Sequence, residues 1–195
     1  AEPYNNLAKL RVLQNRREEA LECCRRGLAI NPDDPVLNQN AALLLLSKGD
    51  FVEGFRLYEY RWNLGNDLRK QYPDMIEWNG EPLSEKTILV YCERGFGDCI
   101  QFFRFCADLK DRGASVIVEA SPELVSLFRQ SDLVSAVIPR GTKHPHADYV
   151  IPIMSLPRVL GTTASDLRLQ EGYLTINENL IEPSLKAKIQ ALAMC

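Results

Sequence analysis

The stretch that decides the fold is TILVYCERGFGDCIQFF, residues 87–103. Residues 87–92 form a compact apolar run of the kind used by a buried parallel strand. A loop with glycines at 95 and 97 follows, and helical spacing then runs over residues 100–109. A strand joined by a short loop to a helix predicts one unit of an open α/β sheet.

The same alternation continues downstream. Residues 115–120 form a second apolar run, after which Ser121 and Pro122 supply a helix cap and a first-turn proline. Further strands are predicted at residues 134–138 and 149–153. This order predicts an open, mostly parallel Rossmann-like sheet with flanking helices over residues 87–175.

The first part of the chain has helical periodicity instead. Gln14, Asn15 and Arg16 form a turn between two apolar stripes, and the prolines at 32 and 35 end the second helix. A shift of about 34 residues places Ala8 on Ala42, Asn15 on Gly49 and Ala20 on Gly54. Small residues that recur where helices approach closely predict helical hairpins over residues 1–68, followed by a connector at 69–86. A helical bundle without repeats is the alternative. Trp78, in the connector, would either anchor the repeats to the next domain or cap the sheet of that domain, and the second role is favoured.

Composition restricts the classes of function. The 195 residues are 46% hydrophobic and 25% charged, and the net charge of −3 lacks the basic excess of a nucleic-acid binder. No apolar run approaches the roughly 20 residues that span a bilayer, so no membrane span is expected. The six cysteines form no Cys-x-x-Cys pair, and the two histidines lie apart from them. This usage predicts free thiols in a reducing cytoplasm, without a metal site.

The loop at residues 93–98 is the main candidate site. It follows the first strand at the carboxyl edge of the sheet, where open α/β sheets bind ligands. Its glycines match neither the dinucleotide fingerprint nor a P-loop. Asp98 and Gln101 have the spacing of a capping box, which would stabilise a helix start. Two interpretations of Asp98 stay open: a cap alone, or a cap that is also a catalytic or acceptor-orienting carboxylate.

Several separated motifs resemble one known architecture. They are GFRLYEYRW at 54–62, WNGE at 78–81, ILV at 88–90, GFGDCIQFFR at 95–104, VEASPEL at 118–124 and PIMSLP at 152–157. In this order they are similar to bacterial proteins in which tetratricopeptide repeats precede a heptosyltransferase-like glycosyltransferase domain of the two-Rossmann GT-B architecture. The first copy carries the small, apolar and proline residues of the repeat family at Tyr4, Leu7, Ala8, Ala20, Gly27 and Pro32. The second copy departs from it at Arg61 and Asn66.

The resemblance implies a function. In such enzymes the N-terminal domain faces the acceptor and the C-terminal domain binds the nucleotide sugar, generally without a catalytic metal or another cofactor. Asp98 matches the aspartate proposed as the general base, and Glu93, Arg94, Gly95, Phe96 and Gly97 would form the acceptor side of the cleft. Glu93 is a second candidate base, and Arg94 either pairs with a phosphate or is a solvated surface residue.

The resemblance also implies limits. Residues 176–195 offer no donor site, so we expect a truncated N-terminal half that is inactive alone and meets a nucleotide sugar only together with a missing second domain. The repeats would bind a protein or peptide acceptor. The alternative is a non-catalytic protein-interaction module built on the repeats.

Overall fold

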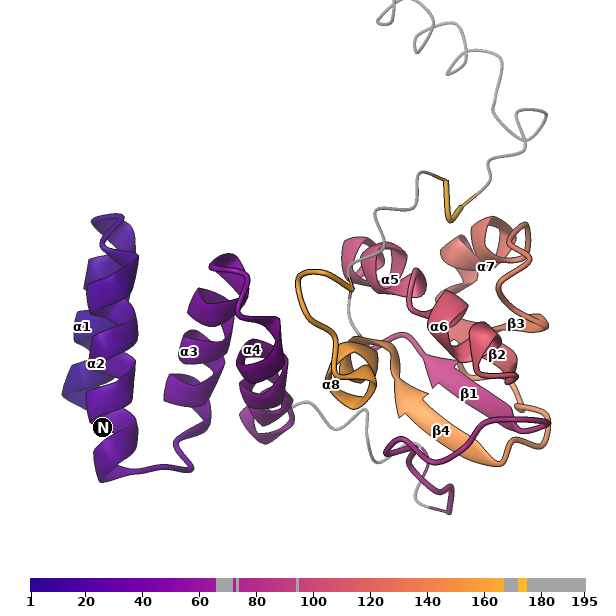
Figure 1. Ribbon diagram of the computed structural model, residues 1–195, viewed down its shortest axis with the longest axis horizontal. Coiled ribbons are helices and arrows are strands. Elements are labelled where there is room, and N and C mark those ends of the chain that lie inside the picture. Colours follow the sequence, from indigo (N-terminus) through magenta and orange to yellow (C-terminus); the bar gives the residue numbers. More distant parts are fainter. Residues whose placement is uncertain (66–71, 73, 94, 167–171, 175–195) are drawn as a thin grey trace, which may run out of the picture.

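The computed structural model describes residues 1–65, 72, 74–93, 95–166 and 172–174. Helices form one end of the molecule and a mixed α/β part forms the other (Figure 1). The predicted segment at 176–195 and residues 69–71 and 73 of the connector lie outside the described residues. Within the described ranges, every helix is too short or too polar to cross a membrane.

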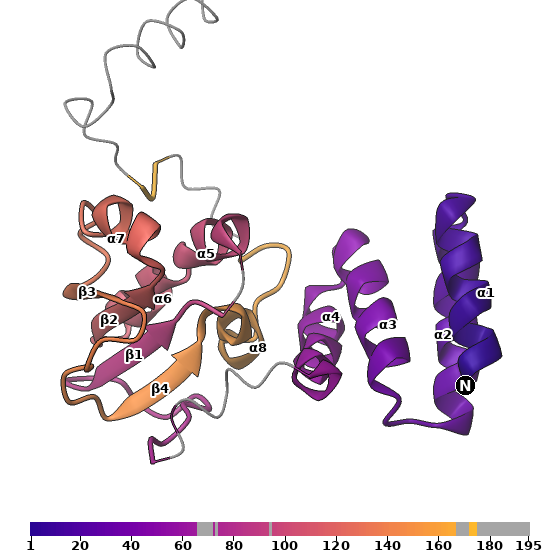
Figure 2. The same cartoon turned by 180° about the vertical axis from the view of Figure 1, so that it is seen from behind.

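The helical part consists of two helix pairs. Helices α1 (Glu2–Leu13) and α2 (Arg17–Ile30) form the first pair, and α3 (Pro35–Ser47) and α4 (Phe51–Tyr58) form the second. The members of each pair lie side by side from both viewing directions (Figures 1 and 2). A 3₁₀ segment, η1 (Glu59–Leu64), continues directly from α4. The turn predicted at residues 14–16 is confirmed, because α1 ends at Leu13 and α2 begins at Arg17.

Equivalent positions of the two pairs share their backbone geometry. Asn15 and Gly49 both have positive φ, at 58° and 84°, in the turn between the two helices of each pair. Ala8 and Ala42 are both buried. A Cβ atom on Gly54 would lie 2.8 Å from Leu46, so this close helix contact excludes a larger side chain. The internal similarity over about 34 residues thus has a structural counterpart.

The sheet has four parallel strands in the order β3-β2-β1-β4. The strands are β1 (Thr87–Tyr91), β2 (Ser115–Ala120), β3 (Ala136–Pro139) and β4 (Tyr149–Pro152). The coarse prediction of helices combined with a parallel sheet is confirmed. The connector also joins this sheet, because Trp78 is fully buried and its backbone N–H donates to Val150 of β4.

One predicted helix is interrupted in the structure. Residues 100–109 were expected to form a single helix, but α5 (Phe96–Phe103) and α6 (Cys106–Asp111) are separate. The Phe105 N–H bonds to the carbonyl of Phe102, three residues back, which tightens the chain into a turn. Arg104 also donates from Nε to the Gln101 carbonyl at that turn.

The two faces of the sheet are covered differently. Helices α5, α6 and α7 (Pro122–Phe128) pack on the face that carries Ile88 and Val90. The opposite face, which carries Leu89 and Tyr91, packs against side chains of η1 and the connector. Parallel sheets need cover on both faces, and here the chain before β1 supplies half of it.

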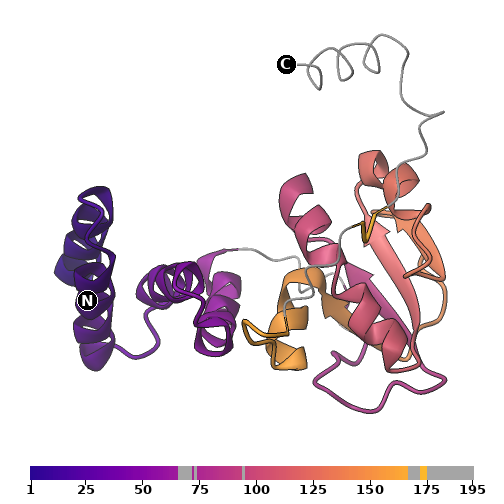
Figure 3. The ribbon, with the colours of Figure 1, turned by 45° about the horizontal axis from the view of Figure 1, so that its top comes forward.

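The helical and α/β parts share a hydrophobic core. Phe55 of α4 belongs to the core of the sheet, and its ring lies edge-on to Phe102 at 6.0 Å between centroids. Its near neighbour Leu57 belongs to the core of the helix pairs. After β4 come the 3₁₀ segment η3 (Ile153–Ser155) and α8 (Leu156–Leu160), and α8 lies between α4 and the sheet (Figures 1 and 3).

Candidate functional site

The candidate loop leaves the carboxyl end of β1 and leads into α5. The arrowheads of β1 and β4 point toward α8 and α4, so the carboxyl edge of the sheet faces the helical part (Figures 1 and 2). The first N–H groups of α5 have no partner within the helix and point toward this edge. The loop therefore combines exposed backbone donors with the place where parallel sheets bind ligands.

Gly95 and Gly97 are not required by the fold. Gly95 has φ −67°, which other residues adopt readily, and Gly97 lies inside the first turn of α5. Among the residues that the structure describes, a Cβ atom added at either position would meet nothing within 4 Å. Neither backbone strain nor internal packing therefore explains these two glycines. Their small size keeps the outer surface of the loop open to an approaching group.

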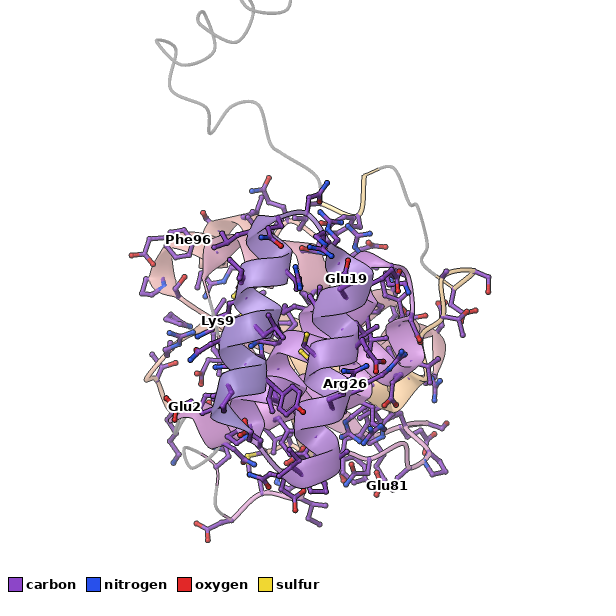
Figure 4. The ribbon with its side chains drawn as sticks, turned by 90° about the vertical axis from the view of Figure 1, so that its left-hand side faces the viewer. Glu2, Lys9, Glu19, Arg26, Glu81 and Phe96 are labelled. Atoms are coloured by element: carbon purple, nitrogen blue, oxygen red, sulfur yellow. The ribbon has the colours of Figure 1, made fainter. Side chains whose placement is uncertain are left out.

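Phe96 lies between these glycines and is 51% exposed. Seen from the α1–α2 end, it stands at the outer rim of the molecule (Figure 4). An exposed aromatic ring beside unobstructed backbone N–H groups offers both an apolar surface and hydrogen-bond donors. This combination suits a polar ligand that has an apolar face, such as a sugar ring or a peptide.

Asp98 does not cap α5, so the capping-box interpretation is wrong. The N-cap of α5 is Gly95, and Asp98 is the third residue of the helix. An acidic side chain in the first turn still interacts favourably with the helix dipole. In the described part of the chain, no side chain or N–H group bonds the half-buried Asp98 carboxylate. The loop thus presents a carboxylate close to Phe96. Arg94 lies outside the described residues.

Glu93 is buried rather than open to a ligand. Its carboxylate Oε1 accepts hydrogen bonds from Arg61 Nη2 at 2.7 Å and Nε at 3.1 Å. The same Nη2 donates to Ser155 Oγ at 2.7 Å, and Nη1 donates to Glu59 Oε1 at 2.7 Å. Arg61 has no exposed surface. Glu93 therefore anchors the base of the loop, while Asp98 is the carboxylate available at its surface.

The charges of this network stabilise one another. Burial opposes the charged form of Arg61, but the carboxylates of Glu93 and Glu59 raise the pKa of its guanidinium above the usual value. Burial raises the pKa of Glu93, and the nearby guanidinium counteracts this rise. We conclude from the short contacts that Arg61 is positively charged and that the Glu93 carboxylate is its buried partner.

A second polar group lies at the same edge and was not predicted from the sequence. Tyr72 donates its hydroxyl to Glu119 at the end of β2, and Arg140 after β3 donates to the Cys92 carbonyl. Glu119 is buried, and burial raises the pKa of Tyr72. The one sequence signal was an acidic residue inside the otherwise apolar run of β2. His144, expected in a solvated loop, lies edge-on to the Tyr72 ring.

A separate groove of about 530 Å³ lies between α1 and α3. Its lining is mainly apolar and carries the two cations Lys9 and Arg17. The lining residues are Ala8, Lys9, Val12, Leu13, Arg17, Asn40, Leu43, Leu44 and Ser47. Among the residues that the structure places, no group of three or more His, Cys, Asp or Glu side chains could hold a metal ion.

Part of this chain is similar to a known protein. No protein family model matches the chain. Protein FlbA of Caulobacter vibrioides (strain ATCC 19089 / CIP 103742 / CB 15) is 32% identical over 111 residues. The match covers 54% of this chain but 18% of FlbA, so the chain spans less than a fifth of this curated relative. The chain is similar to one portion of a much longer protein.

Proposed function

We propose that this chain is the acceptor-facing part of a glycosyltransferase-like protein of the GT-B type. The helix pairs are tetratricopeptide-type repeats, and the sheet is the N-terminal Rossmann-like domain. In this architecture, sugar transfer from a nucleotide sugar also requires a second, donor-binding domain. The buried, free cysteines suit a reducing cytoplasm.

One observation carries this proposal. Gly95 has ordinary backbone angles and Gly97 lies in a helix, and no described residue lies within 4 Å of the position that a Cβ atom would take at either glycine. A residue that the fold does not need is explained best by something that approaches from outside. Asp98 and the exposed ring of Phe96 border the same surface. The glycines thus favour a ligand loop over a purely structural turn.

The chemistry assigned to the loop is proton removal from an acceptor hydroxyl. The Asp98 carboxylate accepts that proton while the hydroxyl oxygen forms a bond to the anomeric carbon of the donor sugar. The bond from that carbon to the nucleotide diphosphate breaks at the same time. The aromatic ring of Phe96 can pack against the apolar face of a sugar or peptide acceptor.

Acceptor binding tests the proposal. An array of saccharides and serine peptides is screened with the chain, and its best hit is titrated against the Asp98→Asn variant. Losing a charge-assisted hydrogen bond costs about 1.5–3 kcal/mol, so binding should weaken about tenfold or more. Asp132→Asn is the matched control, because this acid is 89% exposed and lies outside the loop. Unchanged binding in Asp98→Asn would contradict the assignment.

The groove between α1 and α3 supports a second candidate function, protein interaction without catalysis. Leu43 lines this groove and is 52% exposed, so Leu43→Glu changes the groove without emptying a core. A peptide that loses binding in Leu43→Glu but keeps it in Asp98→Asn would favour this alternative. The reverse pattern would favour the acceptor loop.

A further inference from the structure

The strand order places a topological switch point between β1 and β4. Strands β2 and β3 lie on one side of β1, and β4 lies on the other. In open α/β sheets, ligands bind in the crevice outside the carboxyl ends of the strands at this point. The chain segments that leave β1 and β4 here are the candidate loop, which begins with Glu93, and η3, which ends with Ser155.

A side chain of the helical part fills this position. Arg61, from η1, donates through Nη2 to Glu93 after β1 and to Ser155 after β4, each at 2.7 Å. The guanidinium thus bridges the two strand ends that form the crevice. It is fully buried, as is Ser155, so this part of the crevice is closed to solvent.

The contacts around Arg61 hold it in one orientation. Glu59 accepts from Nη1 at 2.7 Å and also accepts from the Ser155 hydroxyl at 2.9 Å. The guanidinium lies over the ring of Trp62, 4.5 Å from its centroid. A planar group with several fixed donors can hold two segments at once, which a single ammonium group cannot do as well.

We infer that Arg61 is a positioning residue: from the helical part, it fixes the bases of both loops at the switch point, where other open α/β sheets bind a ligand. The described residues of the loop, Glu93 and 95–98, are therefore positioned before any ligand arrives, and their position depends on the helical part. The role of the loop in facing an acceptor rests on the proposed function. The role of Arg61 in ordering the loop is independent of that function.

The repeat pattern supports this assignment independently. Shifted by 34 residues, Arg61 falls on Gly27, whose missing Cβ would lie 2.5 Å from Leu37 of the following helix pair. Both positions therefore face the module that comes next in the chain. The first copy needs a small residue there because it meets another helix pair. The second copy has an arginine because it meets the carboxyl edge of the sheet.

A spin label on the loop tests the inference. Phe96→Cys in a Cys195→Ser background gives an exposed thiol for a nitroxide, while the other described cysteines are buried. In Arg61→Met, the spectrum of the label at position 96 should show increased mobility at temperatures well below the melting temperature. The melting temperature should itself fall by about 10 °C. The same label at Ser126→Cys, on the exposed side of α7, should keep its spectrum.

Arg56→Met is the matched substitution, since Arg56 forms an exposed ion pair with Glu53 in α4. It should change neither label. If Arg61→Met does not fold, Glu93→Gln keeps the shape of the network and should produce a smaller change at position 96. An unchanged loop spectrum in a folded variant, or equal changes at positions 96 and 126, would overturn the inference. Failure of acceptor binding to respond to Asp98→Asn would overturn the proposed function alone.

Discussion

Phe55→Ala should destabilise the helical and α/β parts together. The Phe55 ring is 6% exposed, lies 5.9 Å from Phe51 and 6.0 Å from Phe102 between centroids, and belongs to the core of the sheet. Removing it forfeits about 1.5–3 kcal/mol of burial. The cavity that remains raises the total loss to about 3–5 kcal/mol.

Urea unfolding measures this loss with two probes. Tryptophan fluorescence follows Trp62 and Trp78 near the sheet, and circular dichroism at about 222 nm follows the helices. With a denaturant slope of about 2–3 kcal/mol/M, the midpoint should fall by about 1–2 M for both probes. Val52→Ala, at a site 58% exposed in the same helix, should change stability by less than about 0.5 kcal/mol. Separate transitions, with the helical signal unmoved, would refute a shared core.

Three further predictions follow from other parts of the structure. Gly97→Ala should raise the unfolding free energy by about 0.5–1 kcal/mol in urea while weakening acceptor binding, because the fold has room for the methyl group that a ligand would meet. With Cys195→Ser, a thiol reagent at neutral pH should find no fast-reacting cysteine until the protein unfolds, because the other five are buried and burial raises the pKa of Cys24 to about 11. The Thr87 N–H and Lys86 lower the pKa of Asp148 in the folded state, so its stabilisation is present at neutral pH and is lost as pH falls through that lowered pKa. The difference in melting temperature between wild type and Asp148→Asn should therefore shrink between about pH 5 and pH 2, and a constant difference would contradict the role of that carboxylate.

The strands were predictable because a buried parallel strand needs a continuous apolar run. Residues 115–120 were predicted, and β2 has those bounds. The strand expected at 134–138 is instead β3 at Ala136–Pro139, because Val134 packs against the core rather than joining the ladder. The order β3-β2-β1-β4 could not be derived from local patterns, since it depends on which strands meet in space.

The candidate site was predicted less well than the fold. Local sequence located the loop and its glycines, but it assigned Asp98 to a cap that Gly95 provides. Local sequence also predicted that Glu93 contacts the ligand, although its partner is Arg61, which lies 32 residues earlier in the chain. Arg61 was visible as an exception to the repeat pattern. Its role needed the fold, because only tertiary structure brings a repeat residue to the ends of β1 and β4.

The position of Arg61 limits how this protein can be recombined with others. If the helix pairs and η1 were grafted onto a different domain, the buried Arg61 would keep Glu59 but lose Glu93 and the Ser155 hydroxyl, and Phe55 would lose Phe102. A working chimera must carry Glu93 and Ser155, or an equivalent acid and hydroxyl, at matching strand ends. A segment transferred to another protein should therefore include the whole junction, from α3 to η3, and should not end between the helices and the sheet.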